Sequence, residues 1–150
     1  MTLSNKDWML MAIEEALKAK SLNEVPVGAV VIQENQVIGR GHNSVIKNNS
    51  IAAHAELNAI NEASKTLNNY RLLNCDLYIT LEPCHMCAKA IVDARIKNVY
   101  FAALEPKTGS IISVDNFFDK SFLNHKVNYS LGLMQQESSK LLKDFFLERR

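Results

Sequence analysis

The sequence has none of the features that mark a membrane, secreted or multidomain protein. No apolar run approaches the roughly 18 residues that a membrane-spanning helix needs. Residues 1–7 have neither the basic region nor the apolar stretch of a secretory signal. There is no repeat, no low-complexity tract and no Gly/Pro/Ser-rich linker. The sequence therefore predicts one domain over residues 1–150, resident in the cytoplasm and without a membrane partner.

Cysteine is scarce and the net charge is small. The three cysteines, Cys75, Cys84 and Cys87, cannot all pair with one another, which argues against a disulfide framework. In a reducing compartment a close Cys-x-x-Cys is more often metal-binding or redox-active. The net charge of +1 excludes a strongly basic nucleic-acid-binding domain, so any polyanionic partner must be held by local basic patches.

The sequence that remains is typical of a globular α/β domain, with 47% hydrophobic and 22% charged residues. A capping box formed by Ser4 and Asp7 predicts the first helix, up to about residue 20. Further helices are predicted over 53–64, 84–94 and 135–147, strands over 28–32, 37–39, 76–80, 98–102 and 126–129, and a loop over 104–115. In the last helix the residues expected to face inward are Leu141, Leu142, Phe145 and Phe146. Because strand–helix–strand connections favour parallel pairing, this order predicts an α/β sandwich around a mixed sheet.

Two short motifs carry chemistry, and each falls at the start of a predicted helix. His54-Ala55-Glu56 begins one helix, and Pro83-Cys84-His85-Met86-Cys87 begins the next, directly after a strand. Residues three apart on a helix share a face, and a helix N-terminus favours the thiolate that binds metal. If His54 meets the two sulfurs, zinc gains three protein ligands and keeps one open position, as in a catalytic site.

Glu56 is the predicted general base of such a site. Two thiolates offset the charge of zinc, so the metal activates a water molecule less than it would with neutral imidazole ligands. An adjacent base is then needed, and Glu56 lies two residues beyond His54. We predict that Glu56 takes a proton from the activated water, gives it to the ring nitrogen, and later assists the departure of ammonia.

Each motif alone has a simpler explanation. A lone Cys-x-x-Cys also suits structural zinc or redox use, and His-x-Glu on a helix is usually a solvated face. A structural zinc site usually has four ligands, however, and the sequence has no second cysteine pair. Together, H-x-E followed by P-C-x-x-C is typical of zinc deaminases of nucleobases.

Segments outside the two motifs extend this pattern over nearly the whole chain. They are EVPVGAV (24–30), GHN (41–43), AHAE (53–56), NYRL (69–72), TLEPCHMC (80–87), ARI (94–96), PKTG (106–109), NHKV (124–127) and LKDFFLERR (142–150). With these segments the chain resembles the bacterial tRNA-specific adenosine deaminases of the cytidine-deaminase-like superfamily. The zinc motifs are typical of the superfamily, and the other segments are typical of the tRNA branch.

The resemblance implies a three-layer α/β/α fold with a mixed, mainly five-stranded sheet, a homodimer and one zinc ion per subunit. The implied reaction is hydrolysis of a C–N bond of a cyclic amidine, which converts adenosine to inosine at the wobble position of a tRNA anticodon stem-loop. No DNA partner is expected. Carried over by position, the zinc ligands are His54, Cys84 and Cys87, and Glu56 is the proton shuttle.

The resemblance also implies substrate contacts, and some of these have structural alternatives. The implied contacts are Asn43, Val27 and Pro26 around the base, and Lys107, Arg149 and Arg150 near the RNA backbone. Asn43 offers a donor and an acceptor to a base edge, or it caps a turn after a strand. The three cations can equally be solvated surface. The chain departs from the family at His42, where an aromatic is often found, and at Glu105, where Asp is common; both bear on RNA-loop contacts.

Two other functions compete with this interpretation. A deaminase of a free base or nucleoside, such as guanine or cytosine, would share every zinc residue. A non-catalytic zinc module that binds RNA or protein would need no unligated carboxylate beside the metal, so Glu56 argues against it. The 106–109 segment and the last helix favour RNA over a free base.

Overall fold

The computed structural model describes residues 3–149 of the chain. Its helices are α1 (Asn5–Ser21), α2 (Val45–Asn48), α3 (Ala55–Leu67), α4 (His85–Asp93), the 3₁₀ helix η1 (Phe117–Asp119) and α5 (Gln135–Leu147). Its strands are β1 (Gly28–Gln33), β2 (Gln36–His42), β3 (Asp76–Leu81), β4 (Asn98–Ala103) and β5 (Asn128–Leu131). Within these residues no helix is long and apolar enough to cross a membrane.

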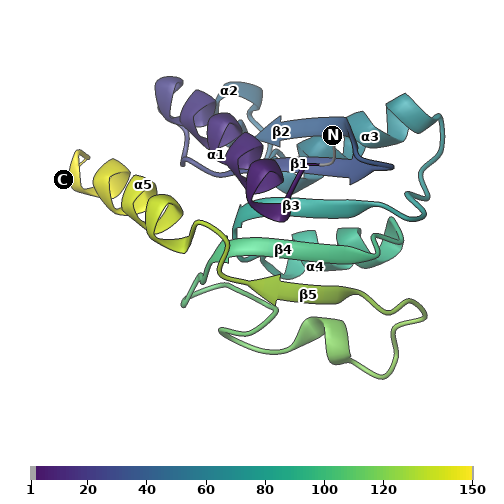
Figure 1. Cartoon of the computed structure of the whole chain (residues 1–150). Helices are drawn as coiled ribbons and strands as arrows, with labels where there is room; N and C mark the ends of the chain where they lie inside the picture. Colours follow the sequence, from purple (N-terminus) through teal and green to yellow (C-terminus); the bar gives the residue numbers. More distant parts are fainter. Residues whose placement is uncertain (1–2, 150) are drawn as a thin grey trace.

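The five strands form one mixed sheet in the order β2-β1-β3-β4-β5. β1 pairs antiparallel with both β2 and β3, whereas β3, β4 and β5 run parallel (Figure 1). The parallel pair β3 and β4 is joined through α4, as a strand–helix–strand connection requires. The predicted α/β fold with a mixed five-stranded sheet is therefore confirmed.

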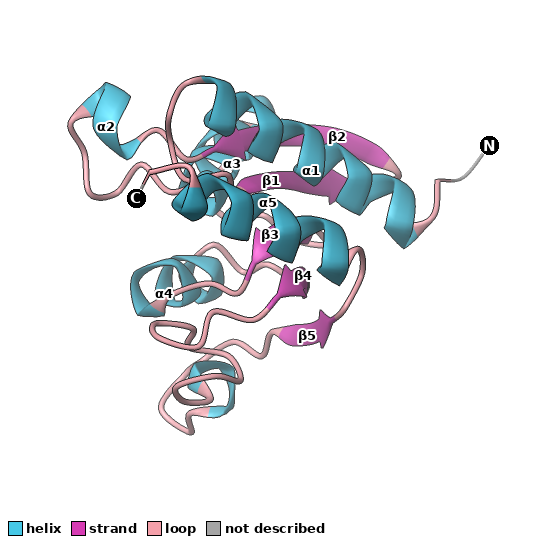
Figure 2. Ribbon diagram, turned by 90° about the vertical axis from the view of Figure 1, so that its left-hand side faces the viewer, coloured by secondary structure: helices cyan, strands magenta, loops and turns pink. Residues whose placement is uncertain are grey.

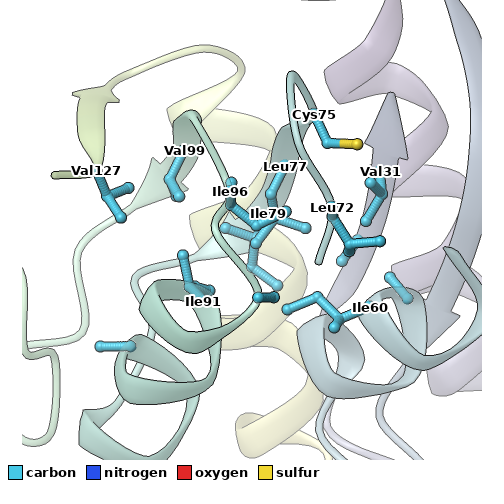
Figure 3. Packing of buried hydrophobic residues seen from close by; sticks show 14 of the residues in the cluster. Val31, Ile60, Leu72, Cys75, Leu77, Ile79, Ile91, Ile96, Val99 and Val127 are labelled. Carbon is cyan, nitrogen blue, oxygen red and sulfur yellow. The ribbon is translucent and has the colours of Figure 1, made fainter. Parts of the chain in front are cut away.

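Helices cover both faces of the sheet, and side chains of alternating direction on each strand make two cores. On β1, Ala29 and Val31 belong to the core beneath α3 and α4, whereas Val30 and Ile32 pack beneath α1. Figures 1 and 2 show α1 on one side of the strands and α3 and α4 on the other. The larger core, seen in Figure 3, joins strands β1, β3 and β4 to α3 and α4.

Two glycines of β2 let α3 lie directly on the sheet. A Cβ on Gly39 would lie 2.3 Å from the carbonyl oxygen of Ala59, and one on Gly41 would lie 2.4 Å from that of Ala55. Both contacts are shorter than van der Waals distance, so only glycine permits this approach of helix to strand. This close packing positions α3 against β2. Glu56, the last residue of the His54-Ala55-Glu56 motif, lies in the first turn of α3.

The predicted elements agree with the structure apart from details of length and one inward-facing residue. The capping box of Ser4 and Asp7 opens α1 as expected. α2 and η1 are short turns of helix that no periodicity indicated. In α5 the prediction for Phe146 is wrong: Phe145 is buried, but the Phe146 side chain is 53% exposed, because adjacent residues on a helix point about 100° apart.

Candidate active site

The two motifs meet at one edge of the sheet. β2, β3 and β4 end at this edge, and β1, which runs antiparallel to β2 and β3, begins there. α3 follows the end of β2 and α4 follows the end of β3. The N-termini of both helices therefore lie outside the carboxyl ends of these strands. In α/β sheets this is the position where ligands bind.

His54, Cys84 and Cys87 form one cluster at these helix N-termini. His54 is the N-cap of α3 and Cys84 is the N-cap of α4, while Cys87 lies in the first turn of α4. The Nδ1 atom of His54 lies 3.4 Å from Sγ of Cys87 and 3.9 Å from Sγ of Cys84. All three ligand atoms lie within 4.8 Å of one another. Residues 30 and more positions apart are thus brought together as the sequence predicts.

Each of the three groups alters the protonation of the others. A hydrogen bond from the Cys87 thiol, with a second from His54, lowers the pKa of Cys84 to about 3. The same thiol hydrogen bond, together with burial, raises the pKa of Cys87. The hydrogen bond to Cys84 raises the pKa of His54. The sulfur of Cys84 is therefore the ligand atom that loses its proton most readily, and a cation that binds to the cluster displaces the remaining protons.

The donor set fits zinc. Two ligand atoms on a tetrahedral zinc ion, at Zn–S and Zn–N distances of about 2.3 and 2.05 Å, lie about 3.6 Å apart. The observed separations of 3.4 and 3.9 Å bracket that value. Among residues 3–149 no fourth ligand joins the cluster. Three protein ligands is the number found in catalytic zinc sites, where the fourth position stays open. Cys75 lies in the large core, and His85 pairs with Asp115, so neither belongs to the cluster.

Glu56 lies beside this cluster in the interior of the protein. Its side chain is buried, and burial is the main reason why the pKa of its carboxyl is raised to about 7. A carboxyl group with a pKa near neutrality can both take up and release a proton at physiological pH, which general acid–base chemistry requires.

A pocket of about 120 Å³ opens onto the cluster. The residues that line it are Val25, Val27, Asn43, His54, Glu56, Leu81, Glu82, Cys84, Glu105 and Thr108. Val27 and Asn43 are thus placed where the sequence predicts. Pro26 is buried and does not line the pocket; Val25 takes that position, because alternate residues of the extended segment before β1 face the same way.

Asn43 has a structural contact as well as a place in the pocket wall. Its Oδ1 atom accepts a hydrogen bond of 2.8 Å from the backbone N–H of Ala55, the first residue of α3. Because Oδ1 accepts from Ala55, the Nδ2 group is the donor that Asn43 can offer to a ligand in the pocket. Asn43 thus accepts a hydrogen bond from the start of α3 rather than from a turn after β2, which differs from the predicted turn cap, and this conformation is compatible with the predicted base contact.

Two of the predicted RNA contacts, Lys107 and Arg149, lie within the described residues, and they differ in their surroundings. Lys107 is exposed, and together with Glu105, Pro106 and Phe146 it lines a second pocket of about 360 Å³. Glu105 borders both pockets. Arg149 donates to Asn23 at 2.9 Å and its guanidinium lies 3.5 Å from the ring centroid of Phe145. Arg150 lies outside the described residues.

The sequence does not single out several residues of the pocket. Val25, Leu81 and Thr108 lie in matching segments but carry no chemistry that distinguishes them from neighbours. Glu82, which precedes the Pro-Cys motif, has a polar side chain in a buried position, and only the structure shows its partners. His42, the other departure from the family, lies 3.3 Å from the buried carboxylate of Glu15 rather than in the pocket.

Comparison with known proteins agrees with this geometry. The family model of MafB19-like deaminases matches residues 3–150. A protein of Aquifex aeolicus named tRNA-specific adenosine deaminase is 44% identical over 97% of this chain and 96% of its own length. The chain belongs to the tRNA-specific adenosine deaminase family. It is thus a deaminase, and its cluster of His54, Cys84 and Cys87 is a candidate zinc site in an enzyme family.

Two solved structures extend the comparison. One, from work on A-to-I editing by tRNA:A34 deaminases at the wobble position of transfer RNA, has a TM-score of 0.89 and 40% identity, and the match covers 92% of this chain and 100% of that chain. A guanine deaminase of Bacillus subtilis has a TM-score of 0.66 and 30% identity, with coverage of 98% and 94%. Similarity in fold and sequence is thus greater to the tRNA deaminase.

Proposed function

We propose that this member of the family deaminates adenosine to inosine at the wobble position of a tRNA anticodon loop. The observation that carries the proposal is a buried carboxylate, Glu56, beside a three-ligand cluster at the floor of a small pocket. The proposed substrate is inferred from the relatives described above, which are tRNA adenosine deaminases. A reaction on tRNA is expected in the cytoplasm, which fractionation of cells that express the protein would test.

His54, Cys84 and Cys87 are the residues that would hold one zinc ion per subunit. When bound there, zinc supplies Lewis-acid activation of a water molecule. Glu56 would take a proton from the water molecule whose oxygen adds to C6 of adenine, and it would pass this proton to the ring nitrogen N1. The second water proton, again through Glu56, leaves with the amino group as ammonia when the C6–N bond breaks. Adenosine and water thus become inosine and ammonia.

The size of the pocket favours a single flipped base. About 120 Å³ is well below the roughly 300–1,000 Å³ of pockets for drug-sized ligands. A base inside a helical stack cannot enter such a pocket, whereas anticodon-loop bases are splayed out at small cost. The apolar side chains of Val25, Val27 and Leu81 would contact the faces of the base, and the polar groups would contact its edge.

Asn43 separates a role in the fold from a role in substrate binding. Asn43→Asp keeps the oxygen that accepts from Ala55 but replaces the amide donor by a charge in a pocket that already holds Glu56, Glu82 and Glu105. We expect kcat/KM to fall at least tenfold, the equivalent of one lost hydrogen bond, while the contact with the start of α3 is kept. Asn43→Ala should lose the same activity and also about 1 kcal/mol of stability. Urea unfolding and steady-state kinetics measure the two effects. Unchanged kcat/KM in Asn43→Asp would show that Asn43 contacts only the start of α3 and not the substrate.

The second pocket suggests where RNA leaves the site. Phe146, half-exposed at the surface, offers a ring on which an adjacent base could stack, and exposed Lys107 offers a cation to its phosphate. Arg149 already holds the end of α5 against Asn23, so its proposed RNA contact would use the rest of its guanidinium. Its neighbour Arg150 is proposed as a backbone contact on sequence grounds alone.

Free-base deamination is the second candidate function, because a guanine deaminase has 30% identity and the same fold. Ammonia release distinguishes the two candidates. With an anticodon stem-loop that carries a wobble adenosine, ammonia should form, whereas free guanine, cytosine and adenosine should give only background. Release from a free base alone would favour this second function, and no release from any substrate by the zinc-loaded protein would favour a non-catalytic zinc module.

We also propose that the chain forms a homodimer. The segment between β2 and α3 exposes two large apolar side chains, Ile46 and Ile51, at 71% and 83% of their surface. Exposed apolar surface of this kind is typical of an interface, and the segment leads directly into His54. Light scattering should give twice the chain mass of 16.9 kDa; the mass of one chain at micromolar concentration would contradict the proposal.

A further inference from the structure

Glu82 is a buried carboxylate for which the deamination chemistry gives no role. It follows β3 directly and is 3% exposed. Its Oε2 atom accepts hydrogen bonds from three successive backbone N–H groups, those of Ile111 at 3.0 Å, Ile112 at 2.7 Å and Ser113 at 2.9 Å. Its Oε1 atom accepts from the N–H of Glu105 at 3.1 Å and from the hydroxyl of Ser113. No cation pairs with it among residues 3–149, so these five hydrogen bonds are the compensation for burying it.

All of these donors belong to one irregular segment, 105–113. Backbone N–H groups outside helices and strands need other acceptors, and here one carboxylate supplies them. The segment fits closely around that carboxylate: a Cβ on Gly109 would lie 2.3 Å from both Cδ and Oε1 of Glu82. The next residue, Pro83, accepts two further bonds from Ser110, at 2.9 Å from its N–H and 3.1 Å from its hydroxyl.

The same segment forms one wall of the base pocket, through Glu105 and Thr108. Glu82 lines the pocket itself, and it lies two residues before Cys84 in the chain. One side chain thus connects the residues just before Cys84 to segment 105–113, which supplies two other residues of the pocket wall. We propose that Glu82 is a positioning residue, which holds segment 105–113 at the distance from Glu56 and the Cys84 sulfur that a base requires.

Glu82→Gln tests this role, since glutamine keeps the size but replaces one acceptor oxygen by an amide that cannot accept from N–H groups. We expect the amides of 105–113 to exchange hydrogen at least tenfold faster, with exchange in β3 and α4 and the zinc content unchanged. On the proposed function, kcat with a wobble-adenosine stem-loop should fall at least tenfold at saturating RNA, because a misplaced wall misaligns the base.

Glu24→Gln is the matched control. Glu24 is equally buried, and its carboxylate accepts two backbone N–H bonds, from Ile46 and Lys47, but neither donor lines the pocket. This variant should loosen only residues near α2 and keep kcat within about threefold. If Glu82→Gln does not fold, Ser113→Ala removes a single donor and should give a smaller increase in exchange confined to 105–113.

Exchange in 105–113 that equals that of the parent would overturn the proposal, as would loosening that spreads evenly through β3 and α4. An equal loss of kcat in the Glu24 variant would also overturn it. Hydrogen exchange needs no substrate, so failure of the parent to deaminate RNA would contradict the proposed function and leave the test of Glu82 intact.

Discussion

Glu56→Gln is expected to keep its metal and lose turnover by about 10³-fold, within the 10²–10⁴-fold range of general acid–base catalysis. The carboxylate of Glu56 is buried beside Cys87 and the raised pKa of about 7 suits it to exchange protons, whereas an amide of the same size cannot take one up. None of the three ligand atoms is altered. Metal analysis and single-turnover kinetics on the same preparation measure both properties.

Glu62→Gln is the matched control for this change. Glu62 lies on the same helix, α3, but its side chain is exposed, so the substitution removes a carboxylate of the same length without touching the pocket. Turnover of this variant should equal that of the parent. Near-normal turnover of a zinc-loaded Glu56 variant would contradict the role of Glu56 as proton shuttle.

Cys84→Ser should lose both metal and activity while the fold remains. Cys84 is the N-cap of α4, and serine is among the preferred residues at that position, so helix α4 should form as before. A serine hydroxyl is a far poorer zinc ligand than a thiolate. Zinc content should therefore fall from about one ion per chain to less than about 0.1, with deamination at background. Elemental analysis and circular dichroism measure metal and fold.

Cys75→Ala provides the comparison with a cysteine outside the cluster. Cys75 is fully buried in the core of Figure 3, where it packs as a small apolar side chain, and desolvation raises its pKa to about 11. This variant should lose some stability yet bind one zinc ion per chain. A Cys84→Ser protein with full zinc and parental turnover would show that Cys84 is not a ligand.

Much of the fold and of the cluster could be predicted from the sequence because the relevant patterns are local. The continuous apolar run in the segment that became β1 reflects burial of both faces of a strand, and the helical spacing in the segment that became α4 reflects burial of one helix face. Both elements lie where expected. The cluster required only that two helix N-termini meet. Strand–helix–strand connections bring such termini to one edge of a sheet, which places His54 beside the cysteines.

The remaining features depend on contacts between distant residues, which spacing does not encode. Glu82 bonds a segment about 30 residues further along, so its partners are invisible from its neighbours. Asn43 caps α3 across 12 residues. The face of Pro26 is set by the register of an extended segment, and a shift of one residue exchanges it with Val25. In each case the residue type indicated which contacts the side chain can make, but the sequence did not indicate where the side chain points.

Sequencing of tRNA after reaction tests the proposed function most directly. The zinc-loaded protein would be incubated with total bacterial tRNA, which is then reverse-transcribed, with the Glu56→Gln protein as control. Inosine is copied as guanosine, so we predict an A-to-G change at the wobble position of a tRNA, absent in the control. No change in any tRNA, with zinc bound and the fold intact, would contradict the proposed function and direct the search to free bases and nucleosides.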